Sequence, residues 1–138
     1  MTLTLASLAS LASLANEHSA VLKKAEAGHL KALREAFVLH TKTDGWEAEE
    51  IDIALGKSIR LNPRNFLTAL KENRSKVPSL GSTVGQLGPD FVDDFSKQKI
   101  ELQKRLSAIQ SVKDASLKTV REECETVLQR QIGQKSGE

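Results

Sequence analysis

The sequence predicts an all-α protein with helical-bundle architecture. Apolar residues recur at helical spacings along most of the 138 residues, and the densest group of helix breakers lies in one segment, residues 74–88. Four Phe, one Trp and no Tyr leave a core of Leu, Ala, Ile and Val, which pack well along helix seams. A chain of this length is expected to form one domain, which we place at residues 1–132.

The first long helix is expected at about residues 2–40. This stretch has no proline, and Gly28 is its only glycine. Leucine occupies every third position near its start, at Leu5, Leu8, Leu11 and Leu14. A three-residue spacing precesses around a helix of 3.6 residues per turn, so this start is expected to be apolar on several sides.

Two short helices are expected next, at about 45–60 and 62–73. Asp44 is a favourable N-cap for the first of them, and its opening turn is rich in glutamate, as the helix dipole prefers. Asn62 followed by Pro63 is typical of a helix start and opens the second. The core-facing positions are expected to be Ala48, Ile51, Leu55, Ile59, Phe66, Leu67 and Leu70. Trp46 and Ile53 lie off this stripe and need another neighbour.

A second long helix is expected at about 89–131, after a long loop at 74–88. Pro89 and Asp90 open it, and an apolar seam from Phe91 to Val127 runs along it. The two long helices are expected to run antiparallel, with the two short helices capping one end. The polar residues 133–138 are expected to form a disordered tail.

The two-helix stalk predicts a homodimer. An isolated pair of helices buries one seam only, and residues 3–15 are apolar on several sides. A second copy of the chain is the simplest cover for such a surface.

Three histidines are the most unusual feature of the first helix. His18, His29 and His40 recur every 11 residues, so a continuous helix would place all three on its apolar stripe. They are candidate metal ligands, although neighbours in this series would stand about 16 Å apart along one helix. The favoured role is a polar break in the seam that pairs with a facing carboxylate, and pH sensing is a third alternative.

A basic surface is expected on the two short helices. With the exposed Trp46, we assign partner binding to Lys57, Arg60, Arg64, Lys71 and Arg74. Within residues 57–76 the only aromatic residue is Phe66, which is expected on the core side, and there is no recognition-helix pattern. The whole chain carries a net charge of only +2. A protein partner is therefore favoured and nucleic acid is not expected.

No motif of catalysis or cofactor binding is present. Gly56-Lys57-Ser58 lacks the upstream glycine of a phosphate-binding loop, because Ile51 stands at that position. The acidic run from Asp44 to Asp52 lacks the order of a calcium loop. Cys124 is flanked by glutamates that disfavour a thiolate, so it is expected to be structural. We expect no cofactor and no enzymatic activity.

The predicted function is therefore a non-enzymatic helical protein–protein interaction or scaffolding module. A small inhibitor or immunity-type protein that masks a partner is one alternative, and a bundle that holds a small apolar ligand or haem on a seam histidine is another. The apolar run of residues 3–15 is too short to span a membrane. A cytoplasmic location is slightly favoured, with a periplasmic or secreted one if residues 1–15 derive from a signal peptide.

Overall fold

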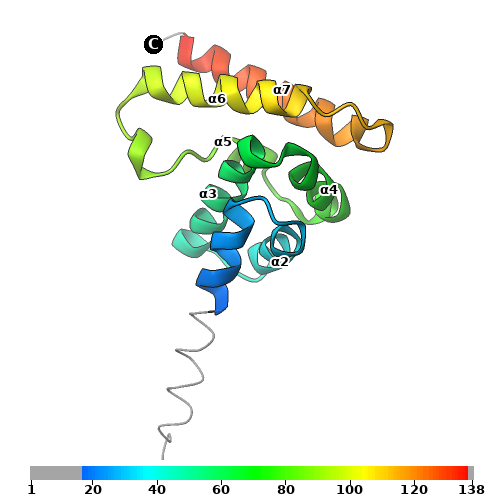
Figure 1. Cartoon of the computed structure of the whole chain (residues 1–138). Helices are drawn as coiled ribbons and strands as arrows, with labels where there is room; N and C mark the ends of the chain where they lie inside the picture. Colours follow the sequence, from blue (N-terminus) through cyan, green and yellow to red (C-terminus); the bar gives the residue numbers. More distant parts are fainter. Residues whose placement is uncertain (1–16, 137–138) are drawn as a thin grey trace, which may run out of the picture.

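The computed structural model of the chain describes residues 17–136, which form helices joined by short turns and contain no strand (Figure 1). The predicted all-α class and helical-bundle architecture are confirmed. Several expectations concern residues outside this range. These are the helix start at residues 2–16 with its leucine triplets, the possible signal peptide, and the last two residues of the expected tail.

The described chain consists of a helix at residues 17–26 followed by six further α-helices. These are α2 (Leu30–His40), α3 (Gly45–Leu61), α4 (Pro63–Asn73), α5 (Leu80–Gly85), α6 (Phe95–Gln110) and α7 (Lys118–Ser136). Short 3-10 turns occur at Arg74–Lys76, Pro89–Phe91 and Ala115–Leu117. In Figure 1 the α6–α7 hairpin lies across one end of the group formed by the 17–26 helix, α2, α3 and α4, with α5 between the two parts.

The short-helix predictions are confirmed. α3 begins directly after Asp44, which stands at the N-cap position although its side chain accepts no capping hydrogen bond from the described helix. Asn62 caps α4 by accepting a hydrogen bond from the Asn65 amide at 3.0 Å. Six of the predicted core positions of these two helices are buried: Ile51, Leu55, Ile59, Phe66, Leu67 and Leu70. Together with Leu33, Phe37, Leu102, Ile109 and Leu128 they form one continuous core. Ala48, the predicted position nearest the start of α3, is only partly buried.

The first long helix is not continuous, which corrects the prediction for residues 2–40. Gly28 adopts φ 90°, and the Gly28 and His29 amides donate to the carbonyls of Ala25 and Lys24, which is a glycine-terminated helix end. A Cβ on Gly28 would lie 2.6 Å from Asn62 Cβ, so this glycine also permits close packing on the α3–α4 junction. The bend turns α2 back onto α4 and buries apolar surface that a straight helix would leave uncovered.

The second long helix is also broken, so the expected helix at 89–131 and the antiparallel two-helix stalk are wrong in detail. Residues 111–117 form a turn without glycine or proline, and α7 folds back along α6 (Figure 1). Val112 and Leu117 are buried at this turn, Arg121 donates to the Val112 carbonyl at 3.0 Å, and Asp114 pairs with Arg64. Tertiary packing thus outweighs the continuous helical pattern of the sequence, because the hairpin buries the seam against itself.

The segment around residues 74–95 also differs from the expectation of a long loop. Ser79 caps α5 by accepting a hydrogen bond from the Ser82 amide. Pro89 opens only a 3-10 turn, Asp93 takes a left-handed conformation with φ 61°, and Asp94 caps the helix that starts at Phe95. At the other end, α7 continues through Gly133 to Ser136, into the segment expected to be a disordered tail.

Candidate functional site

The three histidines do not share one face, because the bend at Gly28 places His18 on a different helix from His29 and His40. His18 lies on the 17–26 helix and His29 is the N-cap of α2, and both are exposed. Only His40, at the end of α2, is largely buried. Within residues 17–136 no three His, Cys, Asp or Glu side chains come together as a metal site would require.

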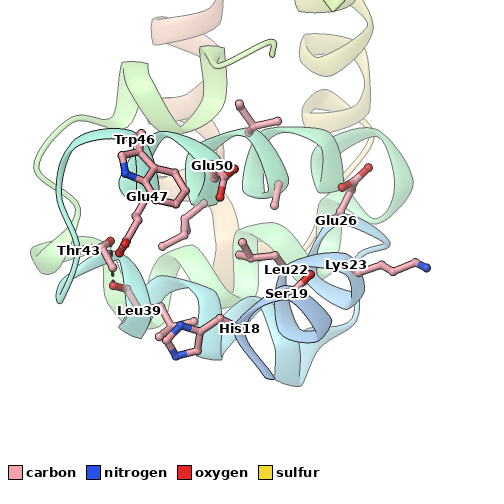
Figure 2. Close-up of a pocket in the computed structure, with 13 residues that line it drawn as sticks. His18, Ser19, Leu22, Lys23, Glu26, Leu39, Thr43, Trp46, Glu47 and Glu50 are labelled. Atoms are coloured by element: carbon pink, nitrogen blue, oxygen red, sulfur yellow. Dashed lines mark hydrogen bonds between the residues drawn. The ribbon is translucent and has the colours of Figure 1, made fainter. Parts of the chain in front are cut away.

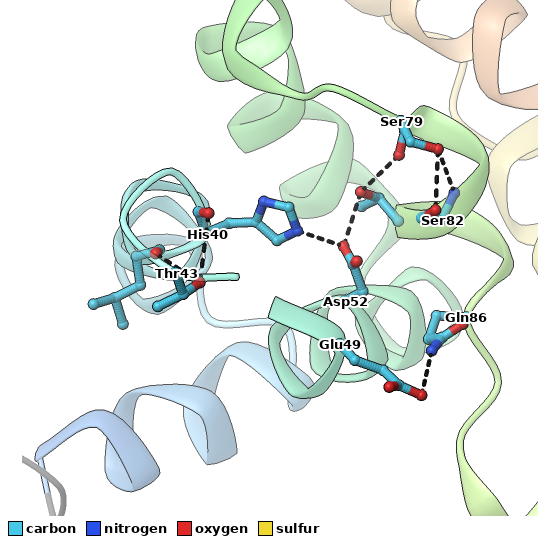
Figure 3. A network of polar contacts seen from close by, with 9 residues as sticks. His40, Thr43, Glu49, Asp52, Ser79, Ser82 and Gln86 are labelled. Atoms are coloured by element: carbon cyan, nitrogen blue, oxygen red, sulfur yellow. Dashed lines mark hydrogen bonds and ion pairs between the residues drawn. The ribbon is translucent and has the colours of Figure 1, made fainter. Parts of the chain in front are cut away.

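His40 belongs to a polar contact that joins α2, α3 and α5. Its Nε2 atom lies 3.0 Å from Asp52 Oδ1 (Figure 3), although the pair lacks the alignment of a hydrogen bond. The buried Thr83 hydroxyl donates to the same Asp52 oxygen at 3.0 Å. The carboxylate therefore stands between the imidazole and the hydroxyl. A hydrolytic triad has the imidazole in that central position, so this arrangement does not activate the hydroxyl as a nucleophile.

The basic residues assigned to partner binding are mostly engaged inside the chain. Four of them form ion pairs: Lys57 with Glu26 at 3.5 Å, Arg60 with Glu101 at 2.7 Å, Arg64 with Asp114 at 2.8 Å and Arg74 with Glu123 at 2.8 Å. Lys71 is the one basic member of the set without an ion pair to any described residue. The predicted basic surface thus links α3 and α4 to the 17–26 helix and to the α6–α7 hairpin.

A buried charge network lies behind this surface. Arg105 on α6 is 1% exposed, and its guanidinium donates to Glu101 and to the carbonyls of Val84 and Gln86 at 2.7 and 2.8 Å. Burial lowers the Arg105 pKa, and the charge of Glu101 opposes this effect. Sequence reasoning missed Arg105. The available signal was its spacing, because it stands between Leu102 and Ile109 on the apolar stripe of α6.

A groove of about 550 Å³ lies on the described surface between α3 on one side and the 17–26 helix and the end of α2 on the other. We call it the Trp46 groove. Its apolar lining consists of Leu22, Leu39, Trp46, Ile51, Ile53 and Ala54. Figure 2 shows Trp46, Glu47 and Glu50 on the α3 side, facing Leu22, Leu39 and His18.

Trp46 lies off the core stripe of α3 and forms part of the groove wall. Ile51 and Ala54 are each 4% exposed and form the groove floor, whereas the Trp46 side chain is 67% exposed at the wall. Ile53, the other residue expected to need a neighbour, is partly covered by Gly88, where a Cβ would lie 3.4 Å from the Ile53 side chain. Of the residues assigned to partner binding, Trp46 is the one that lines this groove.

The thiol of Cys124 does not form a reactive site. Cys124 is fully buried, and burial raises its pKa to about 12, with the neighbouring Glu123 acting in the same direction. A thiol with this pKa is neutral and inert at physiological pH.

None of the helices within residues 17–136 is both long and apolar enough to cross a membrane.

Comparison with known proteins assigns no family. The chain matches no protein-family model, no curated protein and no solved structure. The described residues form an all-helical protein with an apolar groove beside an exposed tryptophan.

Proposed function

We propose that this chain is a non-enzymatic helical module that binds a protein partner through the Trp46 groove. The observation that carries the proposal is the 67% exposure of Trp46 beside a groove with a buried apolar floor. Tryptophan is among the residues most enriched at the energetic centres of protein interfaces. A large aromatic side chain at the edge of an apolar hollow is stabilised when a partner covers it.

Site-specific photo-crosslinking tests this proposal. A benzophenone amino acid replaces Trp46 in one variant and Val92 in another, since these side chains are equally exposed, at 67% and 66%, and only Trp46 lines the groove. After irradiation in lysate of the source organism, we expect a discrete adduct from position 46 and none of that mass from position 92.

The partner identified by that adduct must then bind the unsubstituted chain. The protein has one Trp and no Tyr, so its intrinsic emission reports on the groove itself. Addition of the purified partner is expected to shift this emission to shorter wavelength, because covering the indole removes it from water. The absence of an adduct at position 46, or an unchanged Trp46 emission, contradicts the proposal.

A second candidate function is the binding of a small apolar ligand in the same groove. Its volume of about 550 Å³ falls within the range of roughly 300–1,000 Å³ typical of small-molecule pockets. Titration with lauric acid tests this candidate through Trp46 emission, with the Leu39→Glu variant as the control that fills the apolar lining with charge. His18 is the only one of the three histidines that lines the groove, so haem binding would depend on His18.

Homodimerisation is a further part of the proposal. The predicted stalk is broken into shorter helices, so the dimer is supported by the apolar composition of residues 3–15 and by the exposed side chains of Leu61 and Ile100. Size-exclusion chromatography with light scattering measures the mass directly. A dimer mass is expected, and a monomer mass that does not change with concentration would remove this part of the proposal.

A further inference from the structure

The charge of the Trp46 groove is opposite in sign to that of the whole chain. The lining contains Glu26, Glu47 and Glu50 but only one lysine, Lys23. The chain as a whole carries a net charge of +2. The groove is thus a locally acidic site on a slightly basic protein.

Two of these glutamates are available to a partner. Glu26 is paired with Lys57, whereas Glu47 and Glu50 are exposed and have no ion pair to any residue in the described part of the chain. Most of the basic residues on α3 and α4 are already paired within the chain. Lys23 also has no ion pair to a described residue, but the two unpaired glutamates outweigh it, so the unpaired charge that borders the groove is negative on balance.

The charges are distributed unequally over the two walls. Glu47 and Glu50 both stand on the α3 wall, beside Trp46 (Figure 2). The opposite wall, formed by the 17–26 helix, carries His18, Ser19 and Lys23. An occupant therefore needs positive charge only along the edge that faces the α3 wall. This requirement also fixes how the apolar face of the occupant is oriented in the groove.

The shape of the groove suits a helix. Its walls are helices and its floor is apolar, which is the setting in which an amphipathic helix places side chains at i, i+3, i+4 and i+7. Leu22, Leu39 and Ile51 meet that apolar face. We propose that the occupant is an amphipathic helix of a partner protein that carries Lys or Arg along the edge facing Glu47 and Glu50; this inference rests on the proposed function.

Two synthetic helical peptides test the inference on the full chain. They share leucines at positions i, i+3, i+4 and i+7 and differ only along one edge, which is lysine in one and glutamate in the other. Binding is measured by Trp46 emission and by calorimetry. We expect the lysine peptide to bind about tenfold more tightly at low salt, and this preference to shrink at high salt because the charges are solvent-exposed.

Charge-reversal variants identify the residues responsible. In the double variant Glu47→Lys, Glu50→Lys the preference is expected to reverse toward the glutamate peptide. The double variant Glu47→Gln, Glu50→Gln disturbs the helix start less and is expected to abolish the preference. Glu122→Lys on α7 is the matched control, because Glu122 is exposed and lies outside the groove, and it is expected to leave the preference unchanged.

The outcomes separate this inference from the proposed function. Equal binding of both peptides, or a preference that survives the changes at Glu47 and Glu50, overturns the basic-edge helix while a partner at Trp46 still stands. Failure of both peptides to bind also overturns the inference. The crosslinking result at position 46 decides the proposed function independently, because it does not depend on the charge or conformation of the occupant.

Discussion

Gly56 on α3 faces the guanidinium of Arg105 on α6. A Cβ at position 56 would lie 2.6 Å from Arg105 Nη1 and 2.9 Å from the Gln86 carbonyl oxygen that this guanidinium binds. The glycine of Gly-Lys-Ser is thus explained by packing against a buried charge. The same contact joins α3, α6 and the segment after α5, which support one side of the fold.

A comparison of Gly56 with Gly133 gives a first prediction. Gly56→Ala is expected to destabilise the fold by about 2 kcal/mol, because the added methyl group displaces the guanidinium from its acceptors. Gly133→Ala is the matched control, since Gly133 is also helical but nothing lies within 4 Å of its Cβ position. That variant is expected to stabilise the helix by up to about 1 kcal/mol. Urea denaturation measures both, and equal effects of the two substitutions would contradict the packing explanation.

Removal of the buried guanidinium gives a second prediction. Arg105→Met is expected to lower the free energy of unfolding by about 3 kcal/mol, because two carbonyls and part of Glu101 lose their donor while buried. Lys104→Met is the control on the same helix, where the side chain is exposed, and it is expected to change stability by less than about 0.5 kcal/mol. A stability loss below about 1 kcal/mol for Arg105→Met would show that the network contributes little.

The elements with local signals were predictable from the sequence. Asp44 and Asn62, residues typical of helix starts, mark the beginnings of the two short helices, and apolar spacing identifies most of their buried positions. Gly28 is a weak point in the sequence pattern, but its φ of 90° and its close packing against Asn62, which go with the helix end there, appear only in the structure. The turn at 111–117 has neither glycine nor proline, so nothing local separates it from a helix.

The candidate site was predictable only in part, for a related reason. Trp46 was expected to be exposed because it lies off the stripe of α3. The groove itself needs the bend at Gly28, which brings the 17–26 helix opposite α3. The pairing of Arg74 with Glu123 likewise joins residues 49 positions apart, and such distant partners leave no periodic trace in a single sequence.

The contact between Asp52 and Thr83 gives a third prediction. Asp52→Ala and Thr83→Val each remove one partner of a buried hydrogen bond, and the double variant is expected to be about 1 kcal/mol more stable than the sum of the two losses implies. Thr68→Val is the control, since the Thr68 hydroxyl binds its own helix. Its effect is expected to add to that of Asp52→Ala, and strict additivity for Thr83 as well would argue against the contact.

Trp46 separates function from stability in a fourth prediction. Trp46→Ser is expected to change the free energy of unfolding by less than about 0.5 kcal/mol, because the side chain is mostly in water. Phe66→Ala, at a fully buried position, is expected to cost about 3–5 kcal/mol. Circular dichroism during denaturation measures both variants. A large loss for Trp46→Ser would mean that the indole is part of the core rather than a contact surface.

Cys124 gives a prediction about alkaline pH. Its pKa in the folded chain is raised from 9.0 to about 12, first by burial and then by Glu123. The folded chain therefore keeps the thiol proton at pH values where the unfolded chain has lost it, so stability from this group is complete below about pH 9 and is lost as the pH rises toward 12. Denaturation at pH 8 to 10.5 is expected to show a loss of about 1 kcal/mol per pH unit above 9 that Cys124→Ala lacks. Other ionisations affect the unsubstituted chain and Cys124→Ala equally, so parallel stability profiles for the two would mean that the thiol is not protected. Rapid reaction of the native protein with a disulfide reagent at pH 8 would mean the same.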